Sequence, residues 1–275
     1  LLGHLADRAQ VSVARPGDGG AGDGGAGAEG GAVTVATLNR AVEATSGSLV
    51  LLIDARVEPP AGDWLLAMAQ HAGRPGGGPV GARLLTPAGR VHEVGLVLGL
   101  GGQPLGRMLE GLPAEDYGYL EAARVTRNWS AVSGACVMLP RGLFDELDGL
   151  DKTMGRYAVA DLCLRAGRLG RPTMVTGLAE VMFHGGDVLD PQERTALPLT
   201  NLPSWGGAVP PTTSSRAADR DRGAFQARWK REIGGRDPYF SPHLSRLRTG
   251  CTLPEEDEDR RWNDLMWMPQ PSSPG

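Results

Sequence analysis

The segment Trp129-Ser-Ala-Val-Ser-Gly-Ala-Cys-Val-Met-Leu-Pro-Arg141 decides the fold of this chain, together with the residues that follow it to position 165. Val132 and the apolar run 136–139 predict a buried strand. Gly134 interrupts this strand, and the missing side chain there lets another group approach the backbone. The sequence therefore predicts a core strand with an accessible position near its start.

Two short helices are predicted after this strand. Leu143, Phe144 and Leu147 recur at helical spacing, and the Asp-Gly pair at 148–149 is a turn signal. Residues 162–164 open a second helix, on which Asp161 and Arg165 are four positions apart and form a surface ion pair. Taken alone, strand, helix, acidic turn and helix indicate an α/β protein without indicating its function.

The order of these motifs resembles the acceptor-side half of the family 2 glycosyltransferases. The resemblance is carried by Ser-Gly-Ala-Cys at 133–136, Phe-Asp-Glu-Leu-Asp-Gly-Leu-Asp at 144–151 and Asp-Leu-Cys-Leu-Arg at 161–165, and it covers about residues 33–186. It implies the α/β GT-A fold, a mixed sheet flanked by helices, here followed by an extended C-terminal tail. Proteins of that family transfer a sugar from a nucleotide-sugar donor.

Composition limits the class of protein. The 275 residues, 41% of them hydrophobic, suit one α/β domain with a tail or two small domains. A net charge of −4 argues against nucleic-acid binding. Three cysteines without metal-ligand spacing indicate free thiols in a reducing compartment, and we find no signal peptide or membrane-spanning run. We expect a soluble cytoplasmic protein, and peripheral binding at the inner face of the membrane stays open.

The first 33 residues do not fit the start of the family's pattern. Residues 11–14 correspond to its second strand, and residues 16–31 are almost wholly Gly, Ala and acidic, which predicts a flexible loop. A Gly-rich loop can also cradle phosphate, but the spacing matches no phosphate-binding motif. We expect a chain that is truncated at its start or belongs to a longer polypeptide, with a donor pocket open on one side.

The apolar run 49–53 predicts a buried parallel strand that ends at Asp54. A carboxylate there lies where open α/β sheets bind ligands, although a surface turn is the alternative. The resemblance implies an Asp-x-Asp motif at this place, which holds Mg²⁺ or Mn²⁺ on the donor diphosphate. The chain has Asp54-Ala-Arg56, and a cation cannot be a metal ligand. Two interpretations remain: Arg56 pairs with the diphosphate itself, or the site has decayed.

The catalytic base is missing from its expected place. Inverting transfer needs a group that takes the proton of the acceptor hydroxyl. In the family, a Glu-Asp pair supplies that base, and the matching residues here are Ala158 and Val159, which cannot accept a proton. Asp161 lies about 200° further round the helix from Val159 and is expected to cap the helix or pair with Arg165. Asp161 and Asp151 are the weak catalytic candidates that remain.

The resemblance also assigns binding residues. On the donor side they are Asn39, Asp54, Arg56 and His184, with Asp54 and His184 as the metal candidates. A lone histidine after an apolar run is otherwise a packed or surface residue. On the acceptor side the assigned residues are Trp129, Ser133, Gly134 and Ala135.

The sequence divides the whole chain into four predicted segments. They are a GT-A-like domain (1–189), a Pro/Ser/Thr-rich linker (190–222), a C-terminal helix with a docking segment (223–248), and an acidic tail (249–275) with a solvated run at 255–259. Phe225 and Trp229 mark the docking helix, and residues 237–245 resemble a segment that follows many family 2 domains. Within the first domain we expect helices at 35–45 and 64–69, a hairpin about 86–89, a loop near the acceptor at 99–128 and a strand at 173–175.

Two functions follow from these observations. One is transfer of a sugar to a glycan or lipid-linked acceptor, which the resemblance places in cell-envelope polysaccharide synthesis. The other is a catalytically inactive relative that binds a sugar or a partner protein. An unrelated nucleotide-binding protein is disfavoured, because the chain has no Gly-x-Gly-x-x-Gly or Walker motif.

Overall fold

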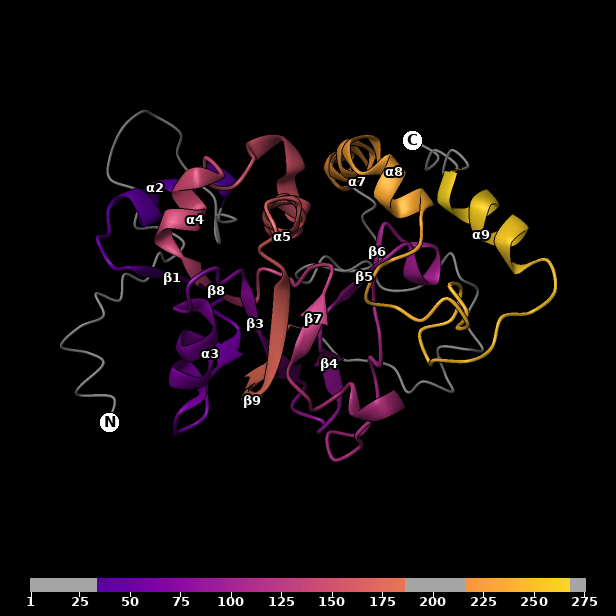
Figure 1. Cartoon of the computed structure of the whole chain (residues 1–275), viewed down its shortest axis with the longest axis horizontal. Helices are drawn as coiled ribbons and strands as arrows, with labels where there is room; N and C mark the ends of the chain where they lie inside the picture. Colours follow the sequence, from indigo (N-terminus) through magenta and orange to yellow (C-terminus); the bar gives the residue numbers. More distant parts are fainter. Residues whose placement is uncertain (1–33, 186–215, 268–275) are drawn as a thin grey trace.

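The computed structural model describes residues 34–185 and 216–267. The predicted strand at 11–14, the Gly-rich loop at 16–31 and most of the predicted linker lie outside these residues. The central sheet has seven strands in the order β1-β8-β3-β9-β2, with β4 beside β3 and β7 beside β9. Its strands are β1 (Leu49–Ile53), β2 (Val57–Glu58), β3 (Val80–Leu85), β4 (Val91–Glu93), β7 (Arg127–Trp129), β8 (Cys136–Pro140) and β9 (Thr173–Phe183). Figure 1 labels each of these strands except β2.

The sheet is mixed. β3 and β9 run parallel, with Val80 opposite Met174, whereas the other described strand pairs of this sheet are antiparallel. Helices flank it, and they are α2 (Val35–Glu43), α3 (Trp64–Ala72), α4 (Arg141–Glu146) and α5 (Ala158–Arg168). This mixed α/β architecture is consistent with a GT-A-like fold and confirms the predicted fold class.

Two apolar cores lie on opposite faces of the sheet. Val137 and Leu139 of β8 belong to the larger core with α2, α4 and α5, whereas Cys136 and Met138 face α3. This follows from the period of two in a strand. In Figure 1, α2, α4 and α5 lie together above the sheet, and α3 lies below them. The predicted helices at 35–45, 64–69 and 143–147 are confirmed, and α5 begins at Ala158, earlier than the apolar run 162–164 indicated.

One strand prediction is wrong in direction. β1 pairs antiparallel with β8 along its whole length, from Leu49–Pro140 to Ile53–Cys136, and forms one end of the described sheet. Its burial alternates, and Ile53 is 36% exposed. Val50 and Leu52 enter the larger core, and Leu51 packs toward α3. The apolar run therefore indicated burial, which is complete only at Val50 and Leu52, and it carries no information on the direction of the neighbouring strand.

The hairpin predicted about residues 86–89 is confirmed for β3 and β4. The chain then leaves the main sheet and forms a separate pair, β5 (Leu96–Leu98) with β6 (Leu105–Arg107). Part of the segment expected as a loop is thus core: Leu100, Leu105 and Met108 are each at most 2% exposed. These apolar residues are separated by glycines with positive φ, which let the backbone fold back on itself. Two 3₁₀ turns lie in this part of the chain, at Leu100–Gly102 and Tyr119–Glu121, and a third at Lys152–Tyr157 precedes α5.

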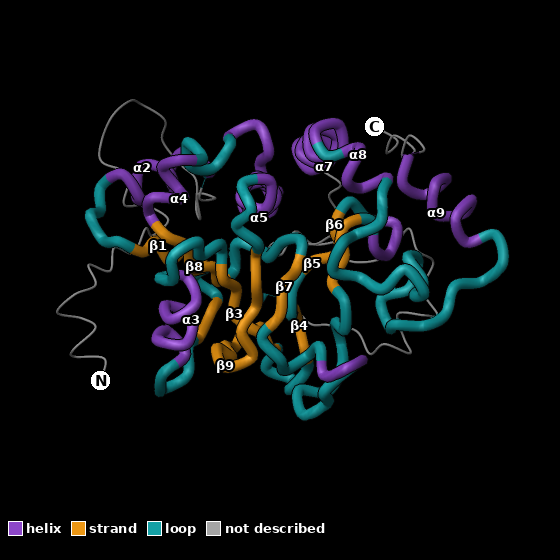
Figure 2. The backbone as a smooth tube through the Cα atoms, viewed as in Figure 1, coloured by secondary structure: helices purple, strands orange, loops and turns teal. Residues whose placement is uncertain are grey.

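The C-terminal region packs on the domain. Its helices are α7 (Arg216–Arg228), α8 (Lys230–Gly234) and α9 (Glu258–Trp267). Figure 2 shows α7 and α8 beside the β5–β6 pair, with α9 outside them. Phe225 and Trp229 are buried in the larger core, and α7 begins within the segment predicted as linker. In the acidic run 255–259, Glu258 is buried and accepts a hydrogen bond from the backbone of Arg246, whereas its neighbours are exposed.

The three cysteines are free thiols, and Cys136 and Cys163 are buried as predicted. Among the described helices, none combines the length and the apolar composition that crossing a bilayer requires.

Candidate functional site

Asp54 follows β1 and is bound on both carboxylate oxygens by Arg56. The backbone N–H of Asp54 donates to the carbonyl of Ala135 (2.8 Å), which fixes the turn after β1 against the loop before β8. Nε of Arg56 donates to Oδ1 of Asp54 (2.8 Å) and Nη2 donates to Oδ2 (2.7 Å). The hydrogen bond from this guanidinium lowers the pKa of Asp54. Asp54 and Arg56 therefore form a bidentate ion pair.

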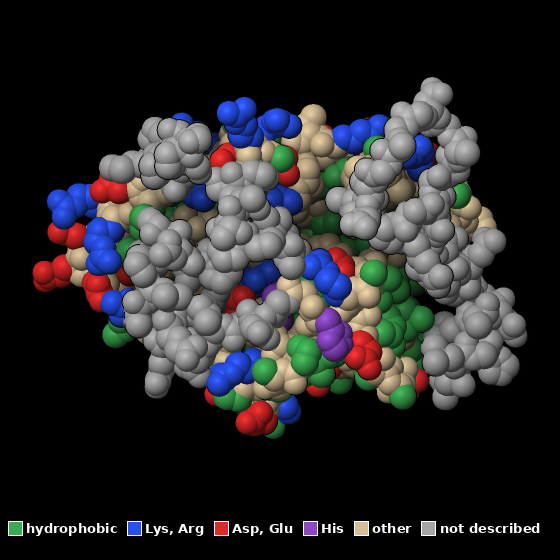
Figure 3. Space-filling view, turned by 180° about the vertical axis from the view of Figure 1, so that it is seen from behind, with side chains coloured by type: hydrophobic (Ala, Val, Ile, Leu, Met, Phe, Trp, Pro, Cys, Tyr) green, Lys and Arg blue, Asp and Glu red, His purple; other side chains and the backbone are tan. Residues whose placement is uncertain are grey.

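His184 lies next to this pair because β2 adds to the end of β9. Val57 pairs with Phe183, and the backbone N–H of His184 donates to the carbonyl of Arg56 (2.9 Å). The guanidinium of Arg56 lies 5.1 Å above the ring of Phe183. Nε2 of His184 is 2.8 Å from Oε2 of Glu58, and both side chains are largely exposed. Figure 3 shows a face of the molecule on which histidine, acidic and basic side chains lie close together.

The loop before β8 lies at the same end of the sheet as Asp54 and His184, because the start of β8 pairs with the end of β1. Gly134 is exposed, and a Cβ there would lie 3.2 Å from Cγ2 of Val159, the residue at the expected base position. Ser133 is buried, and its backbone N–H donates to Oε1 of Glu93 (2.8 Å). We call Asp54, Arg56, Gly134, Val159 and His184 the edge site. Hydrogen bonds and contacts between neighbouring segments bring these residues together.

The donor set of the edge site does not fit a divalent metal. Mg²⁺ and Mn²⁺ need several oxygen ligands, and anionic ones are preferred. Both oxygens of Asp54 are bound to Arg56, and His184 is bound to Glu58. Over residues 34–185 and 216–267, no three His, Cys, Asp or Glu side chains are grouped so that they could hold a metal ion. Arg56 is the one permanently charged cation among the five edge-site residues.

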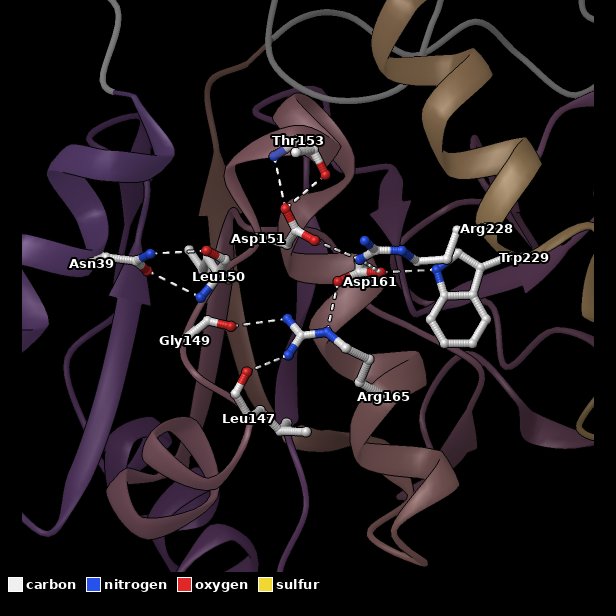
Figure 4. Close-up of polar contacts among 10 residues, drawn as sticks. All are labelled: Asn39, Leu147, Gly149, Leu150, Asp151, Thr153, Asp161, Arg165, Arg228 and Trp229. Carbon is white, nitrogen blue, oxygen red and sulfur yellow. Dashed lines mark hydrogen bonds and ion pairs between the residues drawn. The ribbon is translucent and has the colours of Figure 1, made fainter.

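The two weak catalytic candidates lie in a separate network, which Figure 4 shows. Asp161 is fully buried and accepts hydrogen bonds from Nε of Arg165 (2.7 Å), Nε1 of Trp229 (2.9 Å) and Nη1 of Arg228 (3.1 Å). The predicted pair with Arg165 is confirmed, but it is not a surface pair. Arg165 also donates to the carbonyls of Leu147 and Gly149. Asp161 thus joins the turn after α4 to α5 and the C-terminal helices.

Asp151 and Asn39 make further contacts with the turn between α4 and the 3₁₀ turn at 152–157. Asp151 accepts from the backbone and hydroxyl of Thr153 and pairs with Arg228 at 2.7 Å. These bonds, with the hydroxyl of Thr153 contributing most, lower the pKa of Asp151 to about 2. Asn39 exchanges two hydrogen bonds with the backbone of Leu150. The structure gives these two side chains positioning contacts, and their assignment to catalysis and donor binding stays a prediction.

The four residues assigned to the acceptor are not equally accessible. Trp129, Ser133 and Ala135 are buried, and Gly134 is exposed. Trp129 faces inward on β7, where a Cβ on Gly95 would meet its ring, and the guanidinium of Arg127 lies 4.7 Å from the ring centre. The sequence did not identify Glu58, Phe183 or Arg228, because their contacts join segments that are 67 to 127 positions apart. The apolar run before His184 was the one available signal for Phe183.

Two curated proteins are similar to this chain. The O-antigen biosynthesis protein RfbC of Myxococcus xanthus is 32% identical over 228 residues, which cover 80% of this chain and 16% of that protein. The uncharacterized protein y4gI of Sinorhizobium fredii is 39% identical over 149 residues, which cover 53% of this chain and 16% of that protein. No family model matches the chain. The chain therefore spans about one sixth of the length of each of these relatives.

Proposed function

We propose that this chain is a glycosyltransferase-type domain of a polysaccharide-synthesis protein, and that its edge site binds the diphosphate of a nucleotide-sugar. The observation that carries the proposal is the meeting of Asp54, Arg56 and His184 beside the exposed Gly134 at one edge of a GT-A-like sheet. The similarity to an O-antigen biosynthesis protein supports the setting, in which the acceptor is a glycan or a lipid-linked sugar.

Arg56 is the residue that we expect to bind the diphosphate. Its planar guanidinium suits phosphate oxygens, and it stands where the family has a metal ligand. Asp54 uses the N–H of Nε and one N–H of Nη2, so both N–H groups of Nη1 and the second of Nη2 remain within the described contacts. Asp54 competes with phosphate for this cation, since its lowered pKa keeps it negatively charged at neutral pH. We therefore expect weak binding, which substitution of Asp54 by Asn strengthens.

We further propose that this chain alone does not transfer the sugar. Val159 stands at the base position and is 8% exposed, so neither a side chain nor bulk water is placed there to take the acceptor proton. Asp161 is committed to three donors and Asp151 to Thr153 and Arg228. The second candidate is an active transferase, favoured by the carboxylate of Asp54 at the place where the family's metal motif begins.

Hydrolysis of the donor separates these two candidates. A panel of UDP-, GDP- and dTDP-linked sugars is incubated with Mn²⁺ and the unaltered chain, Val159→Asp or the matched non-basic control Val159→Asn. We expect sugar release above background only with Val159→Asp. Robust release by the unaltered chain would contradict the loss of transfer and would require another base.

A further inference from the structure

Four arginines gather on the surface where the end of α5 meets α8. Three of them line one hollow of about 410 Å³ between β7, α5 and α8, and they are Arg168, Arg231 and Arg236. Arg171 lies in the short connection from α5 to β9, directly before the part of that connection that lines the hollow. Glu232 is the one acidic residue of the lining. We call the four arginines the cationic face.

The charged groups of the cationic face reach solvent. The side chain of Arg168 is 56% exposed, although it pairs with Glu232 and covers the ring of Trp229. Arg231 and Arg236 are exposed, and Arg171 is partly exposed. Four cations and one acid give this surface a net charge of +3, on a chain whose formal net charge is −4. Such an uneven distribution orients a molecule with its positive side toward an anionic surface.

An exposed apolar side chain lies among these cations. Leu169 follows the last residue of α5, between Arg168 and Arg171, and it is 47% exposed. Tyr239, which is partly exposed, also lines the hollow. Cations that flank exposed leucine and tyrosine side chains are typical of protein surfaces that lie in the interface of a bilayer. A soluble polyanion would pair with the cations and leave Leu169 in water.

We propose that the cationic face binds a bilayer that carries anionic headgroups. The four arginines pair with headgroup phosphates, and Leu169 enters the headgroup layer. A surface of this kind would bring the chain to a lipid-linked acceptor. Binding to the bilayer does not depend on nucleotide-sugar binding, because the edge site contributes no residue to the cationic face.

Co-sedimentation of the full chain with lipid vesicles tests this proposal. The vesicles contain phosphatidylcholine with about 30% phosphatidylglycerol, and vesicles of phosphatidylcholine alone are the matched control without charge. The variants are Arg231→Gln, which removes one cation, and Leu169→Ser, which removes the apolar side chain and keeps every charge. Arg40→Gln is the control variant, because it removes an exposed cation from α2. Circular dichroism checks that each variant is folded.

We expect binding to the anionic vesicles at about 0.1 M salt, and binding at least about tenfold weaker to the uncharged ones. Arg231→Gln should weaken binding about fivefold, which is the usual contribution of one cation close to an anionic bilayer. Leu169→Ser should weaken it about threefold, because a half-exposed leucine loses its apolar contact. Arg40→Gln should leave binding unchanged.

Three results would overturn the proposal. The first is equal binding to the two kinds of vesicle, or equal weakening by both arginine variants. The second is loss of binding with Arg231→Gln but not with Leu169→Ser, which would indicate a surface for soluble polyanions. The third is release from the vesicles by glycerol phosphate at constant ionic strength, which would indicate a site for a free phosphate group in the hollow. Arg231 and Leu169 are both exposed, so neither substitution removes a core contact.

Discussion

Replacing Asp161 by Ala should destabilise the chain strongly, because this buried carboxylate joins three segments. The substitution removes the acceptor for the buried indole N–H of Trp229 and the counter-charge for Arg165, whereas Arg228 keeps its ion pair with Asp151. The remaining chain keeps every other contact of these side chains, including the two bonds from Arg165 to backbone carbonyls. The loss therefore measures how much Asp161 contributes to folding. Asp161 begins the segment 161–165, which carries part of the resemblance.

The magnitude follows from the burial of the three partners. Removing one member of a buried ion pair costs roughly 3–5 kcal/mol. The side chains of Arg165 and Arg228 are 20% and 35% exposed, so water partly replaces the lost carboxylate. We therefore expect a loss of about 3 kcal/mol in the free energy of unfolding, at the lower end of that range. For a chain of this size, Tm should fall by roughly 6–12 °C.

Urea unfolding followed by circular dichroism measures this loss. Asp161→Asn keeps an acceptor for Trp229 but turns an amide toward Arg165, so we expect an intermediate loss of about 2 kcal/mol. Asp145→Ala, an exposed position on α4, is the matched control and should change stability by less than about 0.5 kcal/mol. A loss for Asp161→Ala no larger than that of the control would refute the reasoning.

Three further predictions follow from the same contacts. The pKa of Asp151 is lowered from 3.8 to about 2, so its stabilisation is complete above pH 4 and is lost as the pH falls toward 2. Acid unfolding of Asp151→Asn should show a shallower decline over that window, and identical profiles would contradict this. Gly95→Ala places a Cβ 2.3 Å from the Trp129 ring at φ +131°, so thermal unfolding should show a loss of about 3 kcal/mol, whereas Gly142→Ala, which meets no atom within 4 Å, should be nearly neutral. Burial raises the pKa of the three cysteines to about 11 or 12. A thiol reagent at pH 8 should therefore label the folded chain slowly and should label all three cysteines of the urea-unfolded chain rapidly. Equal labelling rates for the folded and the unfolded chain would contradict the burial.

Local patterns predicted most of the elements of the described domain. The spacing of Leu143, Phe144 and Leu147 predicted α4, and the turn residues 86–89 predicted the β3–β4 hairpin, because both depend on neighbours in the sequence. The direction of β1 could not be read in this way, since an apolar run reports burial but not the strand beside it. The buried glycine-rich segment at 99–111 was missed because glycine is typical of loops and does not reveal what its apolar neighbours contact.

The candidate site was predictable in its residues more than in its contacts. Asp54 and His184 were assigned by resemblance, and pairing of β2 with the end of β9 places them close together. The bidentate ion pair between Asp54 and Arg56 could be inferred from the sequence, because the two residues are two positions apart. The partners Arg228 and Trp229 of Asp161 could not be predicted, because nothing local links position 161 to positions 228 and 229.

The account rests on binding of a diphosphate by Arg56 without a metal, and one titration tests this directly. Inorganic pyrophosphate is added to ¹⁵N-labelled chain in EDTA and, separately, with Mg²⁺, and the Nε–H signal of Arg56 and the amide of His184 are followed by NMR. We predict that the shifts of both signals give the same dissociation constant for pyrophosphate under the two conditions, and that Arg56→Gln abolishes the shift at His184. Unshifted signals, or shifts that require Mg²⁺, would contradict the account.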